Sequence, residues 1–286
     1  MVIGTILPNQ RQLQRAAAHA IRNALFALLI AVAMIPFLFP LYWMIASSFK
    51  SPTLIAAMPP MWLWEPTLDN YVNVITKVRL PDYFLNSLII ATASTVLALM
   101  LGLPAAFSIA RYRQYSLASS ILIVRILPGI AYIIPWYIIF SRFKLIGTMP
   151  AIIMAHVMLT LPLMIWIMVS FFEDLPQELF DAALIDGCSI LGVFGKVAVP
   201  LTLPGSIVGA IFAFNGSWNN FIFSSMIGGI KIKTLPVICY GMRQEYSMDW
   251  GGVMAAATII IIPVMIFTLL VQKHIVRGLT FGALKG

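Results

Sequence analysis

The chain has 286 residues, of which 61% are hydrophobic and only 10% are charged. Soluble domains carry about 45–50% apolar and about 25% charged residues, so this composition excludes a single water-soluble globule, and it excludes a disordered chain as well. The net charge of +8 comes from basic residues beside long apolar runs, which is typical of membrane-flanking positions and not of a nucleic-acid surface.

Six apolar runs are long enough to cross the hydrocarbon core of a bilayer, which takes about 20 helical residues. We therefore predict an all-α polytopic membrane protein with six transmembrane helices, near residues 24–46, 84–109, 118–140, 149–171, 205–223 and 252–271. Prolines within or near the runs predict kinks, because neighbouring helices can satisfy the freed carbonyls. These are Pro36, Pro104, Pro135, Pro162 and Pro263.

Basic residues around the first run predict its orientation. Arg11, Arg15 and Arg22 precede it and only Lys50 follows it closely, so the positive-inside rule places the N-terminus in the cytoplasm. Six spans return the C-terminus to the same side. The chain then divides into a cytoplasmic tail at 1–23, a first transmembrane helix with an external segment at 24–83, a transmembrane core at 84–271 and a cytoplasmic tail at 272–286.

The spans carry little reactive chemistry. His156 lies inside the fourth predicted span, and it could either hydrogen-bond between helices or take a substrate or proton role. None of the ten acidic residues sits at the centre of a span, which disfavours a proton- or sodium-coupled carrier. The sequence also lacks a metal-ligand motif, a nucleophile turn and a phosphate-binding loop. A transport protein driven by a partner is therefore favoured over a membrane enzyme.

Residues 173–204, between the fourth and fifth spans, predict a helix, a glycine turn and a second helix. Asp174 suits the N-cap of the first helix, and Glu178 adds negative charge where the helix dipole favours it. Gly187 can take the left-handed conformation that ends a helix. Ser189 would then cap a second helix at 190–199, which Pro200 stops.

On the first of these helices, one face contains Leu179, Ala182, Ala183 and Asp186 by their spacing, and Ala182 and Ala183 are small. Small residues let another surface approach closely. The helix pair could therefore dock on a partner protein, or it could rest as an amphipathic pair on the bilayer surface.

The 173–204 loop resembles the signature of the inner-membrane permease subunits of binding-protein-dependent ABC importers. That signature reads E-A-A, three residues, Gly, nine residues, and I-x-L-P. The same spacing here gives Asp181-Ala182-Ala183, then Gly187, then Val197-Ala198-Val199-Pro200. Asp181 keeps the charge of the family's Glu and shortens its reach. The C-terminal residues 278–286 resemble the tail of the carbohydrate-uptake branch, the maltose-type second permease.

This resemblance implies a type I ABC importer permease fold in a prokaryotic inner membrane, with a carbohydrate as the solute. It implies a heterodimer with a sibling permease, two ATPase subunits that hold ATP and magnesium, and a soluble solute-binding protein. This chain would bind no cofactor or metal and would have no ATPase site of its own. Its ATPase-coupling residues would be Glu178, Asp181, Ala182, Ala183, Asp186, Gly187 and Pro200. A permease for another solute and an autonomous channel or carrier are the alternatives.

Polar side chains within the spans are the candidates for the solute path, because amides and aromatic faces suit a polyhydroxy solute. They are Asn86, Arg125, Asn215, Trp218, Asn219 and Asn220. Hydrogen bonding between helices is the alternative role for each of them. Arg125 is the most costly of these residues to bury, and it could line the path, pair with the sibling permease or extend from a helix end.

Overall fold

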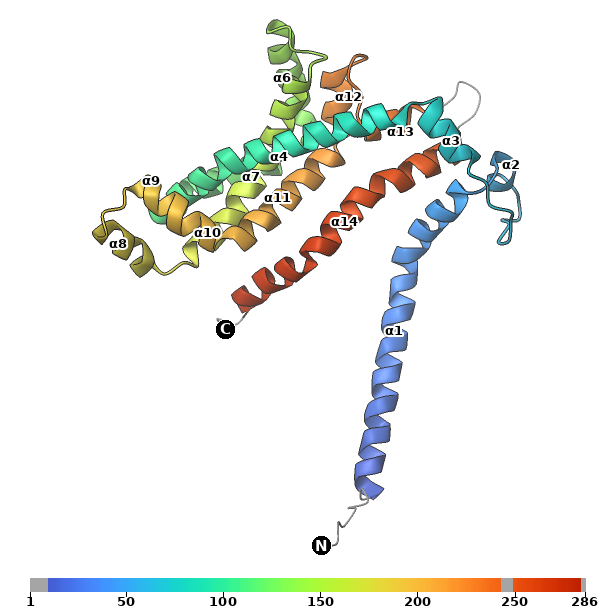
Figure 1. Ribbon diagram of the computed structural model, residues 1–286, viewed down its shortest axis with the longest axis horizontal. Helices are drawn as coiled ribbons and strands as arrows, with labels where there is room; N and C mark the ends of the chain where they lie inside the picture. The colour runs from blue at the N-terminus through green and yellow to red at the C-terminus, as the bar shows by residue number, and fades with distance from the viewer. Residues whose placement is uncertain (1–9, 243–248, 284–286) are drawn as a thin grey trace.

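The structure is a computed structural model that describes residues 10–242 and 249–283, and it describes side chains for residues 19–242 and 249–269. The regular elements in this part of the chain are all helical (Figure 1). They are α1 (Gln10–Ser48), α2 (Pro52–Ile55), α3 (Asp69–Thr76), α4 (Leu80–Arg111), α5 (Tyr115–Ile126), α6 (Ile130–Arg142), α7 (Met149–Glu173), α8 (Gln177–Ile185), α9 (Ile190–Val193), the π-helix η1 (Phe194–Ala198), α10 (Val199–Leu201), α11 (Leu203–Trp218), α12 (Ile222–Gly228), α13 (Leu235–Gly241) and α14 (Trp250–Ala283).

Among the described residues, four continuous helices are long and apolar enough to cross a membrane: α1, α4, α7 and α14. Two bent helix pairs bring the number to as many as six if each pair counts as one span. The predicted all-α membrane fold is therefore confirmed. Two of its predicted spans are not straight helices.

The body of the molecule is formed by α4, α7 and α11, which lie side by side, with α14 along α11 (Figure 1). Small residues allow these backbones to approach closely. A Cβ on Gly102 of α4 would come within 3.1 Å of the Met164 side chain of α7, and Gly209 of α11 faces the same methionine. Met164 is itself buried, so the three helices meet around one thioether.

Helix α1 diverges from this body and is attached to it at one end (Figure 1). The Asn70 amide of α3 donates to the Ser48 and Lys50 carbonyls at 2.9 and 2.8 Å. The Lys50 ammonium lies 4.4 Å from the Trp43 ring and 4.1 Å from that of Trp64. Most described side chains of α1 are exposed and apolar, so its length is free to contact lipid or another membrane subunit.

The third predicted span, at 118–140, is broken into two helices, and its bend is not at Pro135, where a kink was predicted. Helices α5 and α6 meet at an angle of 94°. Pro128 has no N–H to donate to the Val124 carbonyl four residues earlier, and the Tyr132 hydroxyl donates to that carbonyl instead. The break thus occurs at a proline in the connecting segment, whereas Pro135 lies inside α6.

The fifth predicted span is shorter than expected. Helix α11 ends at Trp218, and Phe223, the predicted end of the span, lies in α12. Pro200 does not stop the preceding helix, which continues to Leu201 before an 80° bend into α11. The π-helical turn η1 ends at Ala198, and Pro200 follows in the first turn of α10, where the missing N–H is tolerated.

The loop that contains α8 and α9 lies at one end of the body, and α3 and α13 lie at the other (Figure 1). Helix α4 runs from the α3 end to the α8 end, and α14 runs the same way from beside α13. The 173–204 loop is therefore at the same end of the body as the end of α4 and the C-terminal end of α14.

Candidate functional site

The 173–204 loop begins where α7 ends, and Asp174 belongs to that ending. Its backbone is helical, with φ −73° and ψ −12°, and its N–H donates to the Ser170 carbonyl at 3.1 Å. An N-cap residue needs an extended backbone, so the prediction that Asp174 caps the next helix is wrong. Pro176, with φ −57° and ψ 130°, precedes the first residue of α8.

One buried aromatic ring fixes α8 to the helices of the body. Phe180 is 1% exposed, and its ring centroid lies 5.8 Å from that of Phe107 on α4. The Phe107 ring also packs on Phe172 of α7 at 5.6 Å and on Phe194 of η1 at 5.3 Å. Each such pair contributes about 0.5–1.5 kcal/mol beyond its burial. This aromatic cluster therefore packs α8 against α4, α7 and η1.

A second link to α4 runs through Arg111 at the end of that helix. Its guanidinium donates to Gln177 Oε1 at 2.5 Å and lies 3.3 Å from Asp181 Oδ1. The Asp181 side chain is 61% exposed, so the pair stabilises the loop by only about 0.2–1 kcal/mol. The shorter carboxylate of Asp181 still reaches Arg111, which leaves this acidic residue paired within the chain.

The turn between the two helices has the predicted glycine geometry. Gly187 has φ +86°, which the absence of a Cβ permits. Its N–H donates to the Leu184 carbonyl, and the Cys188 N–H donates to the Ala183 carbonyl, both at 3.0 Å. The Ser189 side chain then accepts from the Gly192 N–H at 3.2 Å, so the prediction that Ser189 caps the second helix is confirmed.

The outer side of the loop is exposed and apolar except for Asp186, and we name it the tip surface. It comprises Leu179, Ala182, Ile185, Asp186, Ile190 and Leu191. Ile185 is 86% exposed and Leu191 is 80% exposed. Ala183, by contrast, is half-buried against the aromatic cluster. The two neighbouring alanines therefore have different surroundings: Ala182 is available to a partner, and Ala183 packs inward. Glu178 and Pro200 are exposed as well.

Most of the predicted solute-path residues bond within the chain. The Asn86 amide donates to the Lys233 carbonyl at 3.1 Å, and the buried Trp218 indole donates to the Ile260 carbonyl at 3.2 Å. The Asn220 side chain accepts from the Phe223 N–H at 3.0 Å, at the start of α12. Asn219 donates to the Asn215 carbonyl one turn earlier on α11 at 3.0 Å, and both of these side chains are exposed.

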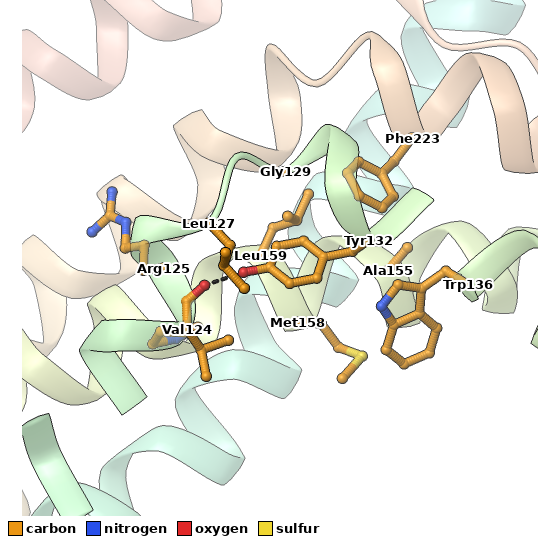
Figure 2. A pocket seen from close by; sticks show the side chains of 11 residues that line it. Val124, Arg125, Leu127, Gly129, Tyr132, Trp136, Ala155, Met158, Leu159 and Phe223 are labelled. Carbon is orange, nitrogen blue, oxygen red and sulfur yellow. Dashed lines mark hydrogen bonds between the residues drawn. The ribbon is translucent and has the colours of Figure 1, made fainter. Parts of the chain in front are cut away.

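Arg125 stands apart from this group. It is exposed at the end of α5 and borders a cavity at the break between α5 and α6 (Figure 2). The cavity that Arg125 borders is lined by none of the predicted asparagines, and Trp218 is 1% exposed.

A buried polar network that the sequence did not reveal joins four helices around His156. Its Nδ1 lies 2.7 Å from the Ser217 hydroxyl, and its Nε2 lies 3.2 Å from the Ser224 hydroxyl. Ser94 of α4 donates to Ser217 at 2.9 Å. The Ser217 hydrogen can then go to Nδ1, and Nε2–H donates to Ser224. The His156 network thereby links α4, α7, α11 and α12.

Replacing His156 with phenylalanine is expected to destabilise the protein by about 1–2 kcal/mol, because the Ser217 and Ser224 hydroxyls lose their buried partner. The thermal unfolding midpoint of the purified chain in detergent measures this change. Met154→Phe is the matched control, since Met154 is an exposed residue of the same helix. Equal midpoints for the two variants would show that the network contributes no stability.

The family model described as "Binding-protein-dependent transport system inner membrane component" matches residues 98–281. A probable ABC transporter permease protein of Sinorhizobium fredii is 35% identical, over 92% of this chain and 96% of that protein. A trehalose/maltose transport system permease protein of Thermococcus litoralis is 34% identical, over 87% and 92%.

Another relative is a sulfoquinovosyl glycerol transport system permease protein of Agrobacterium fabrum, which is 33% identical over 90% of this chain and 92% of that protein. Among solved structures, a bacterial ABC transporter involved in the import of the acidic polysaccharide alginate superposes with a TM-score of 0.74, covering 94% of this chain and 99% of that one. Its sequence identity is 19%, so this likeness shows the fold alone.

Proposed function

Since this chain belongs to the family of binding-protein-dependent transport system inner membrane components, we propose that it forms half of the translocation path of an ATP-driven importer for a carbohydrate. Members of this family are permease subunits and are not enzymes themselves. The names of the trehalose/maltose and sulfoquinovosyl glycerol relatives support a sugar-containing solute for this chain. In the assembled importer, ATP and magnesium would bind to partner ATPase subunits.

The observation that carries the coupling part of this proposal is the exposed tip surface on a rigidly anchored loop. The tip surface presents apolar side chains without covering elements, as a docking surface would. On the inner side, Phe180 and Arg111 connect the loop to α4 and α7. Closure of an ATPase dimer would therefore displace the loop and helices together, as a rigid body that switches between two packed states.

The proposed coupling residues have two roles. Ala182, Asp186 and Glu178 lie on the exposed side of the loop, where they would meet an ATPase subunit. Asp181, Ala183 and Gly187 maintain the shape of the loop through the Arg111 pair, the inward packing and the left-handed turn. Pro200 lies at the bend into α11, where it would help set the direction of that helix.

The other proposed partners are a sibling permease and a soluble solute-binding protein, as expected for this family. The divergent, apolar helix α1 fits a subunit that pairs with a sibling permease in the membrane. A soluble binding protein would deliver the solute on the opposite side from the ATPases. The 173–204 loop must face the ATPases, which agrees with a cytoplasmic N-terminus and C-terminus as Arg11, Arg15 and Arg22 predict.

Reconstitution of the full importer tests this function. The chain is co-purified with the products of neighbouring reading frames, placed in proteoliposomes and given radiolabelled trehalose, maltose, diacetylchitobiose, glycine betaine or spermidine. We expect co-purification of an ATPase and ATP-dependent uptake of a sugar that requires the binding protein. Uptake of only glycine betaine or spermidine would overturn the carbohydrate assignment. Flux through the purified chain alone, without ATP, would identify an autonomous channel or carrier.

A further inference from the structure

A cavity of about 270 Å³ lies at the break between α5 and α6 (Figure 2). Its wall contains the aromatic side chains of Tyr132, Trp136 and Phe223, together with Met158 and Arg125. Small-molecule sites are about 300–1,000 Å³ and combine aromatic walls with a few polar groups. The volume of this cavity is slightly below that range, so it suits one ring-sized group and not a whole oligosaccharide.

The cavity exists because the span is broken. Pro128 leaves the Val124 carbonyl without its helical donor, and the Tyr132 hydroxyl supplies one in its place. This bond holds the Tyr132 ring across the break, beside the segment that joins α5 to α6 (Figure 2). Interrupted helices at membrane depth are tolerated where they line a cavity, and transporter solute sites are commonly built from them.

The cavity wall contains N–H groups that donate to no other residue of the wall. Among the residues drawn in Figure 2, the one hydrogen bond joins Tyr132 to Val124, so the Trp136 indole N–H has no partner in the wall. Its nitrogen is turned toward the Tyr132 side of the cavity. The Arg125 guanidinium lies beyond Leu127 and points away from the Tyr132 and Trp136 rings (Figure 2), and it forms no ion pair with any described residue. Donors of this kind match the hydroxyl groups of a sugar.

The opposite wall is held in place before any ligand binds. Ala155 and Phe223 line the cavity, and the next residues in the chain, His156 and Ser224, hydrogen-bond to each other in the buried network. Both of these wall residues are buried. A preformed wall reduces the ordering that binding requires.

We propose that this cavity is a subsite for the transported solute, and the proposal rests on the carbohydrate-importer function above. One sugar ring lies against the Tyr132 and Trp136 side chains. The Trp136 N–H donates to one of its hydroxyl groups. The second permease of the pair thereby contributes to solute selection instead of serving only as a structural half of the path.

The test uses the reconstituted importer and whichever radiolabelled sugar the wild-type complex takes up. Trp136→Ala is expected to reduce the sugar taken up per ATP hydrolysed by about tenfold, the change that loss of an aromatic contact and its hydrogen bond can produce. Met158→Trp fills the cavity from an exposed position and is expected to give a similar loss. Trp136→Phe retains a ring without the N–H, and its uptake per ATP should lie between those of the wild type and Trp136→Ala. Tyr137→Ala is the matched control, because Tyr137 is a half-exposed aromatic residue of α6 outside the cavity wall.

The outcomes separate this subsite from the proposed function. A wild-type complex that imports no sugar would defeat the carbohydrate function itself. Wild-type uptake together with an unchanged uptake-to-ATP ratio in both Trp136→Ala and Met158→Trp would overturn the subsite alone. The same result accompanied by loss of a bound phospholipid in native mass spectrometry would assign the cavity to an acyl chain.

Discussion

Replacing Gly187 with proline is expected to abolish solute uptake while the binding protein still captures its ligand. Gly187 has φ +86°, whereas proline is held near −65°. Proline would also remove the N–H that donates to the Leu184 carbonyl. The turn between α8 and α9 would have to open, and the tip surface would lose its shape. ATP-dependent uptake into proteoliposomes measures the effect.

Two matched variants separate this backbone effect from side-chain bulk. A Cβ at Gly187 would meet nothing within 4 Å, so Gly187→Asn should retain most uptake, because asparagine tolerates the left-handed region. Gly187→Ala should be intermediate, with a strain of about 1–3 kcal/mol. Full uptake by the proline variant would show that the turn has no part in coupling.

Replacing Phe180 with alanine is expected to separate ATP hydrolysis from transport. The ring is buried among aromatic side chains of α4, α7 and η1, and its removal costs about 3–5 kcal/mol of local packing. Helix α8 would still present the tip surface, but its movement would no longer reach α4 and α7. We expect ATPase activity to persist and uptake to fall severely, measured on the same proteoliposomes.

Phe143→Ala provides the control for removing a phenylalanine, because Phe143 is 71% exposed and lies outside the aromatic cluster. Phe180→Leu restores apolar volume and should recover part of the uptake. If Phe180→Ala transports at the wild-type ratio of solute to ATP, the aromatic cluster does not transmit the movement.

Much of the fold was predictable because its signals are local. About 20 apolar residues in a row predict a span wherever they occur. The left-handed Gly187 and the Ser189 cap followed from residue type and spacing alone. The same holds for the helix–turn–helix order of the 173–204 loop, which the structure reproduces as α8, Gly187 and α9.

The predictions that failed concern where helices break and end. The sharp break occurs at Pro128, whereas Pro135 stays inside α6. Proline chemistry is the same at both positions, and the Tyr132 hydroxyl that stabilises the break is four residues further along the chain. Pro200 was expected to stop a helix and did not, because it falls in the first turn of α10 after the π-turn η1. Hydropathy does not encode either compensation.

In the candidate sites, too, residue type predicted some features, and others depend on contacts with distant parts of the chain. His156 was expected to bond between helices or to meet a solute, and its contacts with Ser217 and Ser224 show the first role. The serine partners could not be identified beforehand, since they lie on other helices about 60–70 residues away. The different surroundings of Ala182 and Ala183 likewise depend on where Phe180 is buried, which spacing alone does not specify.

Photo-cross-linking from the tip surface tests the central claim, namely that this loop contacts an ATPase subunit during turnover. Cys188 is replaced by serine, and single cysteines at Ile185 or Leu191 carry a benzophenone maleimide. Cys239 can remain, because burial raises the pKa of its thiol to about 11 and so suppresses the reactive thiolate. A cysteine at the exposed Tyr115 of α5 serves as the control. We predict ATPase adducts from Ile185 and Leu191 whose yield changes when ATP is added, and few from Tyr115. Adducts with lipid alone, with or without ATP, would contradict the account.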